Sequence, residues 1–203
     1  MVRRKMNDKS GKIIAVTGGI GAGKSTVAKI LKDAGYKVFG ADETYKKLLK
    51  NGDFKRKIYN AIGLEYNGRF IKKQVADAVF GSPDKLKALN DATHSEIMRV
   101  MLEKSKKAAL NSGGLVFNEV PLLFEGGFES LYDGVIVVVR NKEVRIAAAL
   151  ARDKTDEKRV LARINNQIDY EKKDLTAYTL IENDGDLSSL SKKVRKAVEK
   201  FIG

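Results

Sequence analysis

The sequence predicts an α/β fold in which a parallel β-sheet is flanked by helices. Strongly apolar runs mark the buried strands, at Ile13 to Val16, Leu115 to Phe117 and Gly134 to Val139. Two weaker strand candidates lie at Tyr36 to Phe39 and Tyr178 to Ile181. Stretches with helical spacing of apolar residues separate these runs. Strands that alternate with helices in this way form parallel sheets with helices on both faces.

The first strand runs into a glycine-rich loop and then into a helix. Residues 18–25 fit the phosphate-loop (P-loop) pattern G-x-x-x-x-G-K-[ST] at every fixed position. Backbone N–H groups of such a loop face a polyphosphate, Lys24 reaches the β and γ phosphates, and the Ser25 hydroxyl ligates Mg²⁺. The residues expected to bind ATP here are Gly19, Ile20, Gly21, Ala22, Gly23, Lys24, Ser25 and Thr26. A chance glycine-rich turn is the alternative, and the strand and helix on either side argue against it.

The interval from Glu43 to Asn111 breaks the alternation of strands and helices. It contains no convincing buried strand, and its apolar residues recur at helical spacing. We therefore predict a helical insert between two strands of the sheet. The chain returns to the sheet through the turn at Asn111 to Gly114, and an amphipathic helix is predicted near the end, from Leu187 to Ile202.

Composition narrows the class of protein. At 203 residues the chain has room for one substantial core and an insert, and the absence of cysteine excludes disulfides and thiolate metal sites. The net charge of +13 fits either a nucleic-acid partner or a cleft for a polyanionic small molecule. The lysines are scattered, and neither an RNA-binding aromatic signature nor zinc-finger spacing occurs, so we expect no nucleic-acid partner.

Residues 1–11 are predicted to be a basic N-terminal extension. They lack the apolar stretch of a secretory signal, and no apolar run of the chain reaches membrane-spanning length. A cytoplasmic location without a membrane partner is expected on this basis.

A P-loop alone does not distinguish a GTPase, a motor, an ATP-driven machine and a small-molecule kinase. The length of the chain favours the kinase, which needs only a nucleotide core, an acceptor domain and a lid. The base-recognition pattern N-K-x-D of GTPases is not found.

Two carboxylates follow predicted strands. Asp42 comes after the run Tyr36 to Phe39, at the edge of the sheet where α/β proteins bind ligands, and could accept a proton from an acceptor hydroxyl. The alternative is a helix N-cap. Glu119 follows the strand at Leu115 to Phe117 and could hold Mg²⁺ through water, or be an ordinary polar residue at a strand end.

Arginines recur at intervals of seven in the C-terminal half, at Arg145, Arg152 and Arg159, and Arg163 follows four residues later. A break near Thr155 and Asp156 predicts two helices joined by a mobile turn. Arginines on such a lid can neutralise charge on a transferred phosphoryl group. We assign this role to Arg152 and Arg163, whereas a solvated surface position is the equal alternative for Arg145 and Arg159.

Two further side chains are candidates for the acceptor site. His94 is the only histidine and could hydrogen-bond substrate or simply start a helix. Glu125 could cap or orient the loop that follows it.

Taken together, these motifs resemble those of the dephospho-CoA kinase family. Residues 17–26 look like its opening motif, Ala41-Asp42 like the end of its Asp-Ala-Asp element, and Val120 to Glu125 like its Pro-Leu-Leu-Phe-Glu signature. Its C-terminal elements are matched in order by Arg152-Asp153, by Arg163-Ile164-x-x-Gln167 and by Ile181 to Gly185. The resemblance runs from about Lys12 to the last helix.

The resemblance implies a P-loop kinase fold and ATP-dependent phosphorylation of the ribose 3′-hydroxyl of dephospho-CoA, with Mg²⁺. It implies that Asp42 is the general base, that Asn183 and Gly185 shape the adenine pocket, and that Lys72, His94, Glu125 and Arg163 bind the acceptor. The nucleotide core would be residues 12–42, 112–144 and 173–203, the CoA-binding insert 43–111 and the lid 145–172. We expect a monomer or a weak homo-oligomer.

Overall fold

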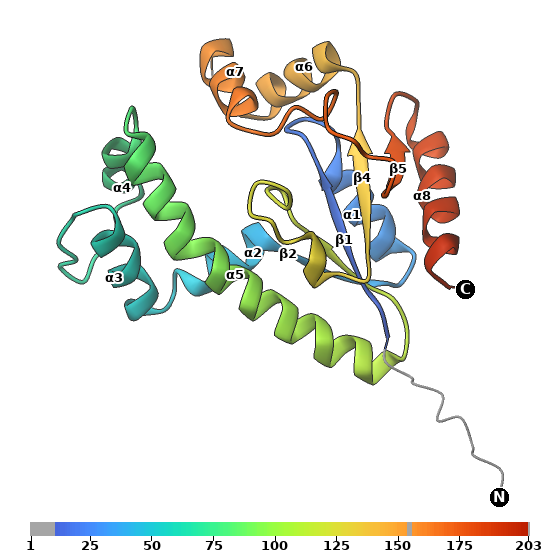
Figure 1. Cartoon of the computed structure of the whole chain (residues 1–203), viewed down its shortest axis with the longest axis horizontal. Helices are drawn as coiled ribbons and strands as arrows, with labels where there is room; N and C mark the ends of the chain where they lie inside the picture. Colours follow the sequence, from blue (N-terminus) through green and yellow to red (C-terminus); the bar gives the residue numbers. More distant parts are fainter. Residues whose placement is uncertain (1–10, 154–155, 203) are drawn as a thin grey trace, which may run out of the picture. The chain divides into compact units, whose positions relative to one another are not determined.

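The computed structural model describes residues 11–153 and 156–202. The predicted N-terminal extension lies outside this part of the chain, apart from Gly11. Five strands form one sheet in the order β2-β3-β1-β4-β5. Their bounds are β1 Ile13–Gly18, β2 Lys37–Gly40, β3 Val116–Glu119, β4 Gly134–Val139 and β5 Thr179–Glu182. All five predicted strands are present, and the α/β prediction is confirmed (Figure 1).

The central strand, β1, is buried along its whole length. It pairs in parallel with β3 on one side and with β4 on the other, and β4 pairs in parallel with β5. The register places Val16 beside Glu119 and Gly18 beside Val138. Because parallel strands all end at the same edge, the segments that follow β1, β3, β4 and β5 meet there.

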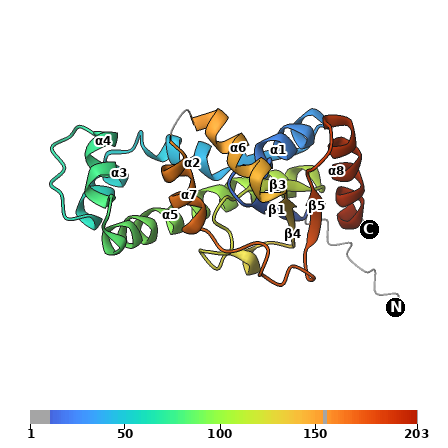
Figure 2. The same cartoon turned by 90° about the horizontal axis from the view of Figure 1, so that it is seen from above.

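One face of the sheet is covered by α1 (Lys24–Asp33) and α8 (Leu187–Ile202), which lie side by side in both views (Figures 1 and 2). The two helices bury residues at helical spacing, for example Val27 and Leu31 in α1, Leu190 and Val194 in α8. These side chains pack on alternate residues of the strands, which include Ile14, Val16, Phe117, Ile136, Val138 and Ile181.

The end of α5 packs on the opposite face. Side chains alternate along a strand, so Asn118 points away from the face that Phe117 covers. The Ser105 hydroxyl donates a hydrogen bond of 2.7 Å to the Asn118 side-chain oxygen, and both residues are fully buried. This buried polar pair fixes the end of α5 against β3.

The chain divides into two compact units. The first holds the sheet and comprises residues 1–39 and 104–203, and the second comprises residues 40–103. The second unit contains α2 (Ala41–Leu48), α3 (Gly52–Ala61), α4 (Lys72–Val79) and most of α5 (Pro83–Ser112). The described residues of this unit contain no strand beyond Gly40, the last residue of β2, so this interval is helical as predicted.

The second unit has its own core, built around Tyr59. Its ring packs edge-on against Tyr66 and Phe70, and its hydroxyl accepts a hydrogen bond of 2.9 Å from the Ile71 backbone N–H. Buried Phe54, Ile58, Ile62 and Val75 complete the cluster. The helices of this unit thus bury apolar faces against one another.

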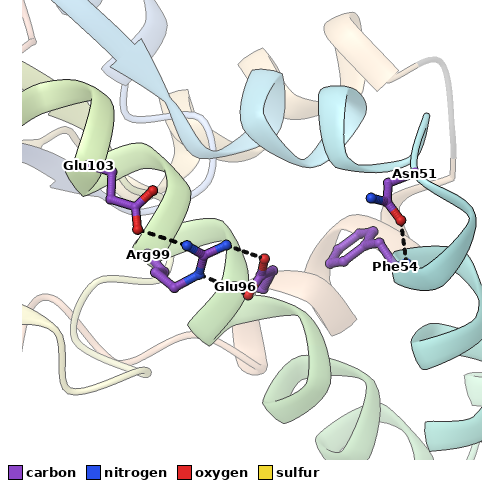
Figure 3. A network of polar contacts seen from close by, with 5 residues as sticks. All are labelled: Asn51, Phe54, Glu96, Arg99 and Glu103. Carbon is purple, nitrogen blue, oxygen red and sulfur yellow. Dashed lines mark hydrogen bonds and ion pairs between the residues drawn. The ribbon is translucent and has the colours of Figure 1, made fainter.

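Local polar contacts define the helices of the second unit (Figure 3). The Asn51 side-chain oxygen caps α3 by accepting from the backbone N–H of Phe54. On α5, Arg99 donates to Glu96 and to Glu103, which lie one turn away on either side. These ion pairs lie within α5, which is a continuous helix of 30 residues.

His94 lies inside α5. The alternative that His94 starts a helix is therefore wrong.

Among residues 11–153 and 156–202, no helix is both long enough and apolar enough to cross a membrane.

Candidate functional site

The glycine loop connects the end of β1 to the start of α1. Gly21 and Gly23 have φ angles of 76° and 98°, in the left-handed region that favours glycine. Gly23 is the N-cap of α1, and no side chain caps this helix. A helix that begins uncapped behind a glycine turn presents backbone N–H groups and the positive end of its dipole to an anion.

Neighbouring segments press directly on the glycines of the loop. A β-carbon at Gly19 would overlap the Arg145 guanidinium, and one at Gly21 would overlap the Arg145 carbonyl oxygen. A β-carbon at Gly23 would overlap the Asn183 side-chain amide. Gly19 and Gly21 occupy variable positions of the P-loop pattern, and both face α6 (Lys142–Asp153). Glycine is required at Gly21, where the backbone of α6 adds to a left-handed φ angle, whereas at Gly19 the neighbour is the end of the Arg145 side chain.

Lys24 is the first residue of α1. Its ammonium group donates hydrogen bonds of 2.7 and 3.0 Å to the carbonyl oxygens of Gly18 and Gly19. Ser25 and Thr26 follow and are exposed to solvent. The loop is thus closed by its own lysine, with two hydroxyl side chains beside it.

Asn183 joins the segment after β5 to the loop. Its side-chain amide donates a buried hydrogen bond of 2.8 Å to the Ala22 carbonyl oxygen. Its backbone N–H donates to the carbonyl oxygen of Val139 at the end of β4. Gly185 lies two residues farther on and is exposed. Both residues predicted for the adenine pocket therefore lie in the segment that contacts the P-loop.

The backbone of Ile20 is bound by two side chains from far along the sequence. The Arg145 Nε–H donates to the Ile20 carbonyl oxygen at 3.0 Å, and the Ile20 N–H donates to the Gln167 side-chain oxygen at 2.7 Å. Arg145 is buried in α6, so a solvated surface position for it is wrong. Arg159, by contrast, is exposed on α7 (Glu157–Asn165) and pairs with Asp156 at the start of that helix.

The segment after β3 and the segment after α7 are bound to each other. Glu119 ends β3 next to Val16, and the Glu125 side chain accepts a hydrogen bond of 3.0 Å from the Ile168 backbone N–H. Tyr170 lies with its hydroxyl beside Thr17 and Gly18, outside good hydrogen-bond geometry with either, and burial raises its pKa to about 12. Tyr170, from the segment after α7, therefore lies buried at the base of the glycine loop.

Asp153 brings the two predicted lid arginines together. Arg152 donates two hydrogen bonds to its carboxylate, at 2.6 and 3.0 Å, and Arg163 of α7 donates a third. These contacts, with Arg152 the larger contribution, lower the pKa of Asp153 to about 2. The ion pairs tie α6 to α7. The turn predicted between these helices includes residues 154–155, which lie outside the described part of the chain.

Asp42, Lys72 and His94 belong to the second unit. Asp42 is exposed in the first turn of α2, whose N-cap is Gly40. Asp42 is therefore not the N-cap, and that alternative is wrong. Lys72 is the exposed first residue of α4, and His94 is half-buried in α5.

Sequence reasoning left Arg145 undecided and gave Gln167 no role. The signal for Arg145 lay in the loop itself, because Gly19 and Gly21 are glycines where the P-loop pattern allows any residue. Such glycines indicate a close neighbour. Which neighbour it is depends on tertiary contacts between residues 125 positions apart.

Asn183→Asp should destabilise the protein by about 1–3 kcal/mol, because a carboxylate oxygen would replace the N–H donor that faces the Ala22 carbonyl. Chemical denaturation at neutral pH measures the change. Asn141→Asp is the matched control, since the Asn141 side chain caps α6 as an acceptor and a carboxylate keeps that role. Equal losses in the two variants would contradict the assignment.

Asp153→Asn should lower the melting temperature at neutral pH, because it removes the shared partner of Arg152 and Arg163. The pKa of Asp153 is lowered in the folded state, so its stabilisation is present above its ordinary pKa near 3.8 and is lost as the pH falls toward 2. The difference between variant and wild type should therefore shrink between pH 4 and pH 2. A difference that stays constant over this range would refute this account.

Related sequences resemble this chain over most of its length. The sequence pattern of the dephospho-CoA kinase family matches residues 12–189. A dephospho-CoA kinase of Fusobacterium nucleatum is 33% identical over 190 residues, which cover 92% of this chain and 97% of the relative. The dephospho-CoA kinase of Thermus thermophilus is 34% identical over 193 residues, which cover 94% and 92% of the two chains.

Two solved structures are similar to this chain over most of its length. The crystal structure of TT1252 from Thermus thermophilus, 34% identical, matches with a TM-score of 0.77 over 95% of this chain and 99% of that one. The dephospho-CoA kinase from Campylobacter jejuni, 27% identical, matches with a TM-score of 0.62 over 95% and 98%. The family pattern covers most of the chain and includes the glycine loop and the residues that contact it. This chain belongs to the dephospho-CoA kinase family.

Proposed function

We propose that this protein transfers the γ-phosphoryl group of ATP to the ribose 3′-hydroxyl of dephospho-CoA, giving CoA and ADP, the last step of CoA synthesis. Membership of a kinase family implies the use of ATP. The observation that carries the proposal is the uncapped start of α1 behind the glycine loop, in a chain whose relatives bear this activity in their names. A cytoplasmic location follows for such a metabolic enzyme, as either a monomer or a weak homo-oligomer.

The first unit supplies the donor half of the reaction. Loop N–H groups and the α1 dipole would hold the polyphosphate, and Lys24 would add a positive charge where charge develops. Arg152 and Arg163 are exposed, and they would exchange part of their bonding to Asp153 for oxygens of the transferred group. Asn183 and Gly185 would border the adenine.

The side chains present fit a magnesium ion held chiefly by the nucleotide. Among the described residues no group of three or more acidic, histidine or cysteine side chains could hold a metal. Mg²⁺ is commonly bound by substrate phosphates, waters and one or two side-chain oxygens, and Ser25 and Glu119 supply such oxygens. When bound, the ion would neutralise charge on the phosphates.

The acceptor half is assigned to residues of the second unit together with Glu125. Asp42 would accept the proton of the 3′-hydroxyl and orient that oxygen for in-line attack, which requires an exposed carboxylate such as this one. Lys72 would pair with phosphate of the acceptor, and His94 and Glu125 would form hydrogen bonds to it. The reaction needs no covalent enzyme intermediate.

ADP release by the purified protein, in the presence of ATP and Mg²⁺, should depend on dephospho-CoA. Nucleoside monophosphates and shikimate should give no more than the background rate, because the acceptor residues would be matched to a CoA precursor. A coupled ADP assay across these acceptors makes the comparison. Stimulation by DNA or RNA, with steep salt dependence, would instead indicate a nucleic-acid-binding ATPase.

Asp42→Asn should lower kcat by about 10²-fold or more, because an amide cannot accept the proton of the 3′-hydroxyl. ATP affinity, measured by calorimetry, should stay close to that of wild type. Glu43→Gln, a neutralisation of the next exposed residue of α2, is the matched control and should leave kcat unchanged. Near-normal turnover in Asp42→Asn would remove Asp42 from the role of base.

A further inference from the structure

We propose that Arg145 and Gln167 are positioning residues that clamp the Ile20 backbone and so pre-organise the glycine loop for nucleotide. Neither residue contacts the reacting atoms in this account. The inference rests on the proposed function only in that the ligand of the loop is ATP or ADP. It adds a determinant of nucleotide affinity that lies outside the P-loop pattern.

Both polar groups of the Ile20 backbone form hydrogen bonds with the clamp residues. The carbonyl oxygen accepts from the Arg145 Nε–H at 3.0 Å, and the N–H donates to the Gln167 oxygen at 2.7 Å. Gln167 also donates through its amide nitrogen to the Pro121 carbonyl oxygen at 3.5 Å. This second bond orients the amide so that its oxygen faces Ile20.

The position of Ile20 explains why a clamp matters. Gly19 and Gly21 flank it, and Gly18 and Gly23 lie close by in the loop. Glycine loses more conformational freedom on being fixed than any other residue. A loop held in one conformation before nucleotide arrives has less entropy to lose on binding, and this raises affinity without a new contact to the ligand.

Arg145 is buried, unlike a surface arginine. It is only 8% exposed, and among the described residues no ion pair is found for it. Its guanidinium packs over Gly19 and lines a small cavity of about 50 Å³, together with Val138 and Tyr170. A buried guanidinium is costly unless it makes specific hydrogen bonds, and the Ile20 carbonyl provides one.

The two halves of the clamp lie on connected elements. Arg145 belongs to α6, whereas Gln167 follows directly after Asn166, the C-cap of α7. Asp153 ties these two helices to each other through Arg152 and Arg163. Arg145 and Gln167 therefore reach Ile20 from one helical pair, and they bind the two peptide groups on either side of its Cα.

The test uses substitutions that separate the hydrogen bond from the charge. Arg145→Gln places an N–H donor the same number of bonds from the backbone as the arginine Nε, but carries no charge. Arg145→Met has similar reach and no donor, and Arg145→Lys keeps the charge with the donor one bond farther out. Affinity for ADP, measured by calorimetry on the full chain without acceptor, reports on the loop alone.

Arg145→Met and Arg145→Lys should bind ADP about tenfold to a hundredfold more weakly than wild type, the loss expected when the Ile20 carbonyl oxygen is left without its donor. Arg145→Gln should stay within about threefold of wild type, because the donor is restored. The KM for ATP should follow the same order, with kcat and the KM for dephospho-CoA little changed. Arg159→Met, on exposed α7 surface, is the matched control and should bind ADP normally.

The opposite order of ADP affinities among the Arg145 variants would contradict the proposed clamp. If Arg145→Lys binds normally and Arg145→Gln does not, the charge acts on the nucleotide directly and Arg145 is a contact residue. Normal affinity in all three variants would also refute it. If the Arg145 variants do not fold, Gln167→Met tests the other half and should weaken ADP binding likewise. Wild-type activity on dephospho-CoA is measured separately, so failure of the clamp is distinguished from failure of the proposed function.

Discussion

The structure of the nucleotide half depends on how the glycine loop satisfies its carbonyl oxygens. A loop that turns N–H groups toward an anion turns carbonyl groups the other way, and these need donors. Lys24 donates to Gly18 and Gly19, Arg145 donates to Ile20 and Asn183 donates to Ala22. These donors come from α1, from α6 and from the segment after β5, so the anion site requires the assembled sheet and its flanking helices.

The parallel sheet is what allows these donors to converge. Four neighbouring strands, β3, β1, β4 and β5, end at one edge, and the segments that follow them supply Glu119, the glycine loop, α6 and Asn183. The register of β3 is fixed by its alternation, because a slip by one residue would turn Phe117 out of the core under α1 and α8 and Asn118 away from Ser105. The core under α1 and α8 thus sets the positions of polar groups at the edge.

Most of the residues assigned to the acceptor lie in the second unit. Asp42, Lys72 and His94 sit on the helices of a second unit with its own aromatic core around Tyr59. A separate core lets such a unit keep its shape independently of the nucleotide half. The exposed Arg152 and Arg163 share one carboxylate, Asp153, and solvent-exposed pairs of this kind are weak enough to be exchanged for phosphate oxygens.

The α/β class, all five strands, the helical insert at residues 43–111 and the P-loop could be predicted from the sequence, because each depends on local spacing or composition. The sequence did not determine where helices begin or which contacts individual side chains make. It left open an N-cap role for Asp42 that Gly40 takes, and it left Arg145 between lid and surface. Only the tertiary structure placed Arg145 and Gln167 on Ile20, since these contacts join residues 125 and 147 positions apart. Periodicity records which residues are buried, but not which distant polar groups will meet at the edge of the sheet.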